Sequence, residues 1–514
     1  MPTYKRPGVY VEEFLTASSP NLNVASTSTA AFVSPYNRGP SSSITALASL
    51  PTLCQSWNDF VQLYGGFGGT VSGAATSTYL AHGVYQFFAQ GGRQAYVVRV
   101  LGTGGVKATR TLVDRAGSPL STLSLTAANE GVWGNSIYID IVDRTTGRFD
   151  LNVYFGGTAS ANLVEKWIDL SMVDSDTRYI VNIVNSTVAG SRYVVAADLA
   201  SATVAPNDTP VAQIGTALAT GADGSAPSTT QFANALATLD QITDSLILCA
   251  PSEVNTTNVT AMINYAEGRG DVFCLLDTAI SLSVASAVTY AGAISPISSY
   301  AAVYWPWVNS IDPSMSIPNS TIYLPPSGIV AGVIARIDAT RGVFKAPAGI
   351  TARISGSVGL QYNSTNSDLD TLSVAQINAV RVIPGAGVCV FGTRTLKTTA
   401  ADRYVPVRRT LIFVKKTLLN STQFAAFEPN DSNLWTRIRS VCEQALTSLW
   451  QQGGLRGRTA AQAYYVRCDE TNNTPATIAQ GYVNIEIGVA LQYPAEFVVI
   501  RIGQWEGGQS ASEI

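Results

Sequence analysis

Ser245-Leu-Ile-Leu-Cys-Ala250 and Asp271-Val-Phe-Cys-Leu-Leu276 are two short apolar runs that decide the fold of this chain. The residues between them, around 256–268, have a helical pattern. A strand, a helix and a second strand in this order predict an α/β layer with a mostly parallel sheet.

The same alternation continues on both sides of these runs. Upstream, apolar residues at helical spacing around Phe232 lead into the first run. Downstream, Pro325-Pro-Ser327 is expected to cap a further helix. We therefore expect an α/β domain over residues 206–370.

The N-terminal part of the chain predicts an extended arm followed by a helix and a strand. Residues 1–20 contain Pro7-Gly8, a turn signal, and then a β-prone run that cannot bury itself alone. Helical spacing over 76–90 ends at Gly91-Gly92, and Gln94–Val100 is predicted to form a strand.

Residues 105–205 differ in character from their flanks. Short β-prone runs are separated by Gly, Asn, Asp and Ser, which predicts an outer β-sandwich domain. The predicted strands are Ser136–Val142, Phe149–Phe155, Ile180–Val184 and Arg192–Ala196.

The C-terminal part predicts a mixed α+β domain. A helix is expected over 434–450, with an apolar stripe that starts at Leu434 and ends at Leu449. Alternating apolar residues from Val483 to Leu491 predict a strand, and a final strand is expected over Phe497–Ile502.

The composition argues for burial against partner subunits and against nucleic acid. Charged residues make up only 13% of the 514 residues, about half the usual share. The formal net charge is −3, and Arg408-Arg409 and Lys415-Lys416 are isolated basic pairs. Proteins that bind a nucleic-acid backbone carry a basic excess, so we expect no nucleic-acid partner.

The cysteines and the apolar stretches indicate a soluble protein assembled in a reducing cytoplasm. The six cysteines show no metal or redox spacing, and most have apolar neighbours, as expected of small core residues. The uncharged stretch 278–311 is broken by Pro296 and Pro306 and is rich in Ser and Ala. We interpret it as buried core, with no insertion into a membrane.

No catalytic, cofactor or metal site is expected. His82 is the only histidine, and the motifs of zinc proteases, phosphate-binding loops and serine hydrolases are all missing from the sequence. Asp277 ends a predicted strand, where α/β enzymes often place function, but it lacks a partner and is expected to cap a helix or turn. A hydrolase or ligand-binding α/β protein with an unrecognised site stays open as the alternative to a structural protein.

Six short motifs, in order along the chain, resemble the tail sheath proteins of contractile phages and related injection machines. They are Tyr4-Lys-Arg-Pro-Gly-Val-Tyr-Val-Glu-Glu13, Phe87-Phe-Ala-Gln-Gly-Gly-Arg-Gln-Ala-Tyr-Val-Val-Arg-Val100, Pro325-Pro-Ser-Gly-Ile-Val-Ala-Gly332 with Arg341-Gly-Val-Phe-Lys-Ala-Pro-Ala348, Phe391-Gly-Thr-Arg-Thr-Leu396, Phe427-Glu-Pro-Asn430 and Pro494-Ala-Glu-Phe497. The resemblance spans residues 4 to about 505 and is weakest over 105–205.

The resemblance implies an α+β and α/β multidomain architecture whose middle domain has a subtilisin-like fold. The expected divisions are an N-terminal arm (1–20), the first part of an inner core domain (21–104), the outer β-sandwich (105–205), the α/β domain (206–370), a C-terminal core domain (371–494) and a C-terminal arm with a tail (495–514).

The resemblance also implies a structural function. Such subunits stack as six-fold rings around a tail tube and contract to drive the tube through the host envelope. The implied partners are further copies of the chain, the tail tube protein, and baseplate and tail terminator proteins, within a virion assembled in the host cytoplasm. The sheath of a phage-tail-like bacteriocin or of an extracellular contractile injection system stays open as an alternative.

Three groups of residues are the expected sites of assembly. Both arms are expected to add strands to a neighbouring subunit, although ordinary pairing within one subunit is the alternative. The N-terminal arm residues are Pro7, Gly8, Val9, Tyr10, Val11, Glu12 and Glu13. The C-terminal arm residues are Phe497, Val498, Val499, Ile500, Arg501 and Ile502. Candidate tube-facing residues, on two predicted helices, are Lys415, Lys416, Arg437, Arg439 and Glu443.

Overall fold

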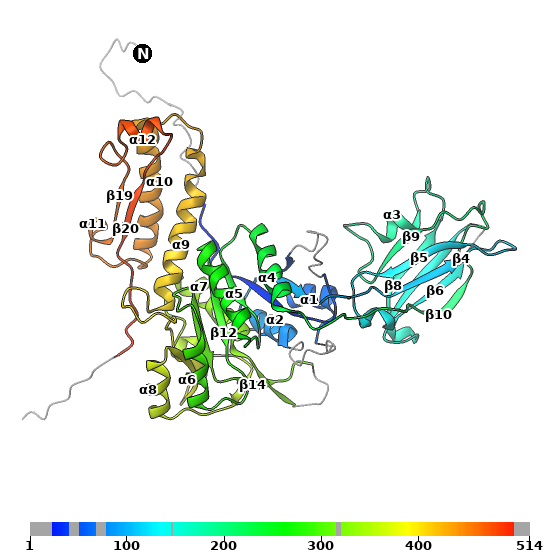
Figure 1. Cartoon of the computed structure of the whole chain (residues 1–514), viewed down its shortest axis with the longest axis horizontal. Coiled ribbons are helices and arrows are strands. Elements are labelled where there is room, and N and C mark those ends of the chain that lie inside the picture. The colour runs from blue at the N-terminus through cyan, green and yellow to red at the C-terminus, as the bar shows by residue number, and fades with distance from the viewer. Residues whose placement is uncertain (1–22, 41–50, 68–78, 145–146, 315–319, 498–514) are drawn as a thin grey trace, which may run out of the picture. The chain divides into compact units, whose positions relative to one another are not determined.

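The computed structural model of the chain has a mixed α+β, multidomain fold with two compact units (Figure 1). It describes residues 23–40, 51–67, 79–144, 147–314 and 320–497. The larger unit comprises Thr27–Thr410 and the chain from Gln492 onward, and the smaller comprises Leu411–Leu491 and the chain up to Ser26.

An eight-stranded sheet forms the centre of the larger unit, in the order β18-β17-β13-β12-β11-β1-β3-β2. The six inner strands pair in parallel, and the two edge strands, β18 and β2, are antiparallel to their neighbours. The bounds are β1 (Thr29–Pro35), β2 (Thr52–Cys54), β3 (Gln94–Val100), β11 (Leu246–Cys249), β12 (Val272–Asp277), β13 (Ala301–Trp305), β17 (Ile377–Ile383) and β18 (Gly387–Val390). The predicted parallel α/β layer is thereby confirmed, and it recruits strands from both flanking parts of the sequence.

Helices cover both faces of this sheet, which is why its inner strands are continuous apolar runs. On β1, Ala31 and Val33 point into a core shared with α4 and α5, whereas the Phe32 ring lies 5.9 Å from the Phe87 ring of α2 on the other face. Outside residues 106–217, the helices of the larger unit include α1 (Trp57–Tyr64), α2 (Tyr79–Ala89), α4 (Thr229–Thr238), α5 (Thr256–Arg269), α6 (Val284–Ala293), α7 (Pro326–Arg341) and α8 (Asn366–Val374). A small sheet of β14 (Val308–Ile311), β15 (Thr321–Leu324) and β16 (Ser357–Leu360) lies in the same unit.

Two glycines of the sequence Pro325–Gly332 let α7 pack against the backbone of α2. A Cβ atom on Gly328 would lie 2.6 Å from the Cα atom of Gly83, and one on Gly332 would lie 2.6 Å from the carbonyl oxygen of Phe87. No side chain fits at either place, so glycine is required for this helix crossing.

Residues 106–217 form two antiparallel sheets that share one apolar core. One sheet contains β4 (Thr109–Val113), β5 (Ser121–Ala127) and β9 (Val194–Asp198), and the other contains β6 (Ile137–Asp143), β7 (Phe149–Phe155), β8 (Leu163–Leu170) and β10 (Gln213–Ala217). Strand β10 lies beyond the division expected at residue 205.

The strand predicted over Ile180–Val184 was wrong, because these residues form the helix α3. Its two buried side chains, Ile180 and Val184, are four residues apart and so lie on one face of a helix. In so short a run this spacing cannot be told from strand alternation by sequence alone.

The smaller unit is built on long helices and a short hairpin. Helix α10 (Ser432–Gln451) confirms the predicted helix and buries the predicted apolar stripe; the Asp431 carboxylate caps it by accepting a hydrogen bond from the backbone N–H of Leu434 at 2.8 Å. The remaining elements are α9 (Val405–Thr422), whose residues from Leu411 on belong to this unit, α11 (Ala460–Ala463), β19 (Tyr464–Arg467), α12 (Pro475–Ala479) and β20 (Glu486–Val489).

The strand predicted from Val483 to Leu491 is shorter than expected. The backbone N–H of Asn484 donates to the side chain of Asn473, and its carbonyl oxygen accepts from the side chain of Asn472. Side-chain amides therefore replace the strand ladder before Glu486.

The expectation for the cysteines holds in the structure. All six cysteines are buried with free thiols, as predicted for core residues. Among the helices that the structure describes, none is both long and apolar enough to cross a membrane.

Candidate functional site

The hairpin β19–β20 of the smaller unit is the best candidate for an assembly site. In the described part of the chain its sheet contains these two strands alone, so each strand has one edge without a strand neighbour. A sheet edge carries backbone N–H and C=O groups that can pair with a strand from another chain. A two-stranded sheet is also marginal by itself and gains stability from an added strand.

One face of the hairpin is fixed by packing, which holds its edges in place. Val466 of β19 lies directly opposite Ile487 of β20, and both pack against the core formed by α10. On the other face, the Glu486 carboxylate accepts hydrogen bonds from the Tyr465 hydroxyl at 2.9 Å and from Arg467 at 3.3 Å. Side-chain contacts therefore hold the hairpin on both of its faces.

The chain enters the smaller unit along α9. The backbone N–H groups of Asn23 and Ala25 donate to the hydroxyls of Ser421 and Thr417, at 3.3 and 3.2 Å. The two hydroxyls are four residues apart and therefore share one face of α9. These two hydrogen bonds fix the position of the chain at residues 23–25 on α9.

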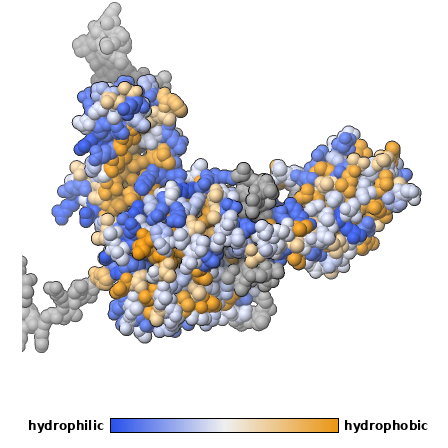
Figure 2. Space-filling view, in the orientation of Figure 1, coloured by the Kyte–Doolittle hydropathy of each residue, from blue (hydrophilic) through white to orange (hydrophobic). Residues whose placement is uncertain are grey.

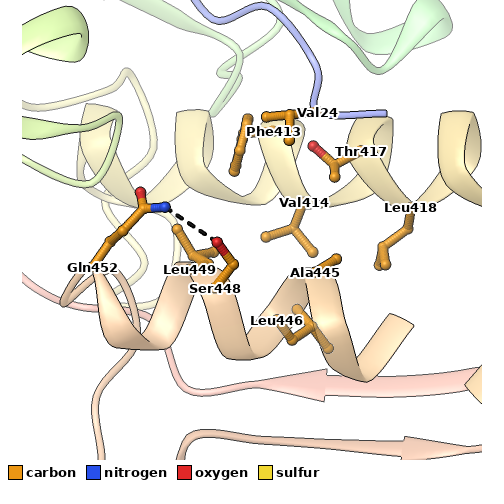
Figure 3. A pocket seen from close by; sticks show the side chains of 10 residues that line it. All are labelled: Val24, Phe413, Val414, Thr417, Leu418, Ala445, Leu446, Ser448, Leu449 and Gln452. Carbon is orange, nitrogen blue, oxygen red and sulfur yellow. Dashed lines mark hydrogen bonds between the residues drawn. The ribbon is translucent and has the colours of Figure 1, made fainter. Parts of the chain in front are cut away.

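Val24, between these two bonds, lies against an apolar pocket formed by α9 and α10 (Figure 3). Figure 2 shows hydrophobic surface gathered over this part of the unit. The lining residues, besides Val24, are Phe413, Val414, Thr417, Leu418, Ala445, Leu446, Ser448, Leu449 and Gln452. A residue of the chain's own N-terminal segment therefore forms part of the pocket wall.

Most of the predicted arm residues lie outside the described residues. This applies to Pro7–Glu13 and to Val498–Ile502. Phe497 is described; its side chain is exposed and it belongs to no strand.

The two arginines among the candidate tube-facing residues point in different directions on α10. Arg437 and Arg439 are two positions apart on α10, which turns their side chains by about 200° from each other. The Arg437 guanidinium lies 4.9 Å from the centre of the Phe424 ring. Arg439 lies near Asp469, whose pKa is lowered by hydrogen bonds from Thr471 and further by nearby arginine charges.

On α9 and α10, the exposed candidates are separate from the buried basic pair. Lys415 and Glu443 are exposed and Lys416 is half-buried. Arg408 and Arg409 are buried and form ion pairs with Asp402 and Asp338.

The two residues considered for catalysis, His82 and Asp277, are both buried. His82 is buried, 3.9 Å from the Asp312 carboxylate and with its ring 4.8 Å from the Phe67 ring. No cluster of three metal-binding side chains occurs among the residues that the structure describes.

Asp277 caps a helix and a turn, in agreement with its sequence interpretation. Its carboxylate accepts hydrogen bonds from the N–H and hydroxyl of Ser327, at 2.7 and 2.6 Å, and from the N–H of Ser252 at 3.0 Å. Ser327 lies in the first turn of α7, where an acceptor is favourable. Complete burial raises the pKa of Asp277 to about 6 and outweighs these three donors.

Replacing Asp277 is expected to change stability in a pH-dependent way. Because its folded-state pKa lies above the ordinary value of 3.8, the stability that this titration adds is present below pH 3.8 and is lost as the pH rises through about 6. The free energy of unfolding of the native chain should therefore fall relative to that of Asp277→Asn between pH 4 and 7, by up to about 3 kcal/mol, and the Tm advantage of the native chain should shrink with it. Asp277→Ala, which leaves three buried donors unpaired, should be the less stable variant at every pH. Thermal melts at constant ionic strength measure both; a Tm difference that grows with pH would contradict the assignment.

Comparisons with known proteins agree with this architecture. The family model described as the phage tail sheath protein central domain matches residues 225–396, and that of the phage tail sheath C-terminal domain matches residues 398–504. The tail sheath protein of Vibrio phage KVP40 is 30% identical over 159 residues, which are 30% of this chain and 23% of the phage protein. The match thus spans under a quarter of that relative's length.

Solved structures match over nearly the whole chain. A chain of the anti-feeding prophage baseplate, 6-fold symmetrised, has a TM-score of 0.56 and 21% identity, with 98% of this chain and 99% of that chain covered. A chain of the PVC sheath complex, from an extracellular contractile injection system in its contracted state, has a TM-score of 0.59 and 22% identity over 98% and 99%. These likenesses establish the fold.

The fold and the two matching family models define a multidomain protein of the kind found in contractile tails. The two family models together cover more than half of the sequence. The chain belongs to the phage tail sheath protein family.

Proposed function

We propose that this chain polymerises into a sheath by strand addition at the β19–β20 hairpin. The observation that carries the proposal is the pair of open strand edges on a hairpin fixed against α10. Backbone pairing between an extended segment and a sheet edge is a general mode of protein assembly.

The arms of neighbouring subunits are the proposed occupants of these edges. Eight extended residues span roughly 25 Å, which is enough to reach a neighbour. Val9 and Val11 of the N-terminal arm alternate as strand residues do, and the C-terminal arm contains the β-prone run Phe497–Ile502. Because Asn23 and Ala25 are hydrogen-bonded to α9, the N-terminal arm has a fixed point of attachment to its own subunit.

A contact of this kind builds an open polymer. Each subunit donates its arms and accepts those of others, so the contact is head-to-tail and does not close on a pair. We propose six-fold rings stacked helically around a tail tube; the 6-fold symmetrised baseplate of the anti-feeding prophage supports this symmetry. Baseplate and tail terminator proteins are the proposed partners at the two ends.

Contraction is proposed to keep the arm links while the subunit bodies rotate into a wider, shorter array. The free energy then comes from contacts between bodies that form only on contraction, and the sheath needs no catalytic site. The proposed location is the virion, after assembly in the host cytoplasm. The likeness to the PVC sheath also supports an extracellular contractile injection system as the setting.

Electron microscopy of the purified chain tests self-assembly. The expected result is striated cylinders formed without any other protein or nucleotide. Uniform small particles over the whole accessible concentration range would contradict the proposal and favour a hydrolase or ligand-binding protein.

Charge neutralisation tests which helix contacts the tube. Lys415→Gln with Lys416→Gln changes α9, and Arg437→Gln with Arg439→Gln changes α10. Because charge complementarity across an interface contributes mainly when solvent is excluded, we expect one pair to weaken tube binding about tenfold and the other to have little effect. Co-sedimentation with preformed tubes measures this, and unchanged binding by both double variants would refute both helices as tube contacts.

A further inference from the structure

The two C-terminal motifs singled out in the sequence, Phe391–Leu396 and Pro494–Phe497, meet in one cluster of the larger unit. The Glu496 carboxylate accepts a hydrogen bond from Arg394 Nε at 2.7 Å through one oxygen. Its other oxygen accepts from the Tyr404 hydroxyl at 2.8 Å. Glu496, which lies 102 positions after Arg394 in sequence, is thus bound through both of its carboxylate oxygens.

Arg394 is itself tied into the eight-stranded sheet. Its backbone N–H donates to the side chain of Asn378, at 2.6 Å, and its Nη1 donates to the carbonyl oxygen of Ser373 at 2.6 Å. Asn378 lies on β17, is almost fully buried, and donates to the carbonyl oxygen of Val303 on β13 at 3.1 Å. A continuous chain of hydrogen bonds therefore leads from Glu496 into the centre of the sheet.

The steric fit around this cluster is close. A Cβ atom on Gly392 would lie 2.6 Å from the Cα atom of Asn378, so the loop that carries Arg394 lies directly on β17. The Arg394 side chain is 12% exposed and that of Glu496 is 23% exposed. A charge-assisted pair with so little solvent access is stronger than an ordinary surface ion pair.

The position of Glu496 gives the cluster a function. The chain returns to the larger unit at Gln492, and Glu496 lies two residues before the C-terminal segment 498–514. An interaction at this point fixes where the C-terminal segment starts and in which direction it leaves the unit. Because the chain around Glu496 is already ordered, its ordering no longer costs conformational entropy when the segment binds a partner.

We propose that Glu496, Arg394 and Tyr404 form an anchor that fixes where the C-terminal arm leaves its own subunit and passes load on that arm into the eight-stranded sheet. The inference rests on the proposed function, because it assumes that the arm binds a neighbour. It assigns a positioning role to three residues outside the strands that pair.

The variant Glu496→Ala tests the anchor, because its effect on the critical concentration for polymerisation can be compared with its effect on the Tm of the subunit. The critical concentration for polymer formation, measured by sedimentation, should rise about tenfold, since one or two backbone residues must then be ordered on binding. The Tm of the unpolymerised subunit should stay within about 2 °C of the native value, because an irregular segment at the end of the unit is all that is released. Glu496→Gln keeps the Tyr404 bond and should have a smaller effect, as should Tyr404→Phe.

Asp143→Ala is the matched control. It removes a more exposed ion pair with Arg115, at 28% and 48% exposed, in the region 106–217, which contains none of the predicted arm residues. It should leave the critical concentration unchanged.

The outcomes separate this inference from the proposed function. If the native chain forms no polymer, the proposed function fails and the anchor with it. If the native chain polymerises and Glu496→Ala does so at the same critical concentration, the anchor alone is refuted. A fall in Tm by 10 °C or more in Glu496→Ala, roughly what a loss of several kcal/mol produces, would show a structural role in the fold instead.

Discussion

Deletion of residues 1–20 is expected to leave a folded subunit that forms no tubes. The deletion ends before Asn23, so the hydrogen bonds of the remaining chain to Ser421 and Thr417 on α9 are kept. The strand that would pair with a neighbour's hairpin is gone, and with it the head-to-tail link. Sedimentation and electron microscopy measure the loss, and the Tm of the subunit checks that the fold is intact.

Two substitution sets in the arm make the same test without a deletion. Val9→Asp with Val11→Asp changes alternate positions, which lie on one face of an extended strand, and should abolish tubes. Glu12→Gln with Glu13→Gln is the control, with the backbone and length unchanged, and should retain them. Tubes of normal length from the 1–20 deletion would refute the role of the N-terminal arm.

The largest effect on folding is expected from Asp338→Ala. Arg409 donates two hydrogen bonds to the Asp338 carboxylate, at 2.9 and 2.6 Å, and one to the carbonyl oxygen of Thr27. Both side chains are nearly inaccessible, at 4% and 3% exposed. Loss of the carboxylate leaves a buried positive charge, which typically costs about 3–5 kcal/mol.

Two further variants show whether the stability lost in Asp338→Ala comes from an unpaired buried charge or from lost packing. Asp338→Leu with Arg409→Met replaces the pair by apolar side chains and should regain most of the lost stability. Glu486→Ala breaks the exposed pair with Arg467, at 53% and 50% exposed, and should cost less than about 1 kcal/mol. Chemical denaturation of the 1–20 deletion form avoids the stabilising effect of polymerisation. Equal losses for Asp338→Ala and Glu486→Ala would contradict the assigned burial.

Elements with a long periodic pattern could be predicted from the sequence. The 20-residue helix α10 and the strand–helix–strand unit β11–α5–β12 were found because their apolar positions repeat over enough residues to exclude other periods. The membership of the eight-stranded sheet was harder, because β1 pairs with β11, where Thr29 lies opposite Leu246, and no local pattern records pairing between residues so far apart in sequence.

The candidate site was predictable only in part. The alternating residues 483–491 pointed to a strand in the correct place, but the side-chain amides that shorten it to β20 depend on tertiary contacts. The pairing of Arg394 with Glu496 joins two motifs that the sequence presented separately. Arg437 and Arg439 are close in sequence, yet the helix turns them apart, so a charge cluster in sequence was not a patch in space.

Hydrogen exchange of the β19–β20 hairpin tests strand addition most directly. Amides of residues 464–467 and 486–489 would be followed by mass spectrometry in the native polymer and in the 1–20 deletion subunit, with β6 and β7 as an internal reference. We expect the hairpin peptides to gain strong protection on polymerisation while the reference peptides change little, because new backbone hydrogen bonds form only at the hairpin edges. A polymer in which the hairpin amides exchange as fast as in the subunit would contradict the account.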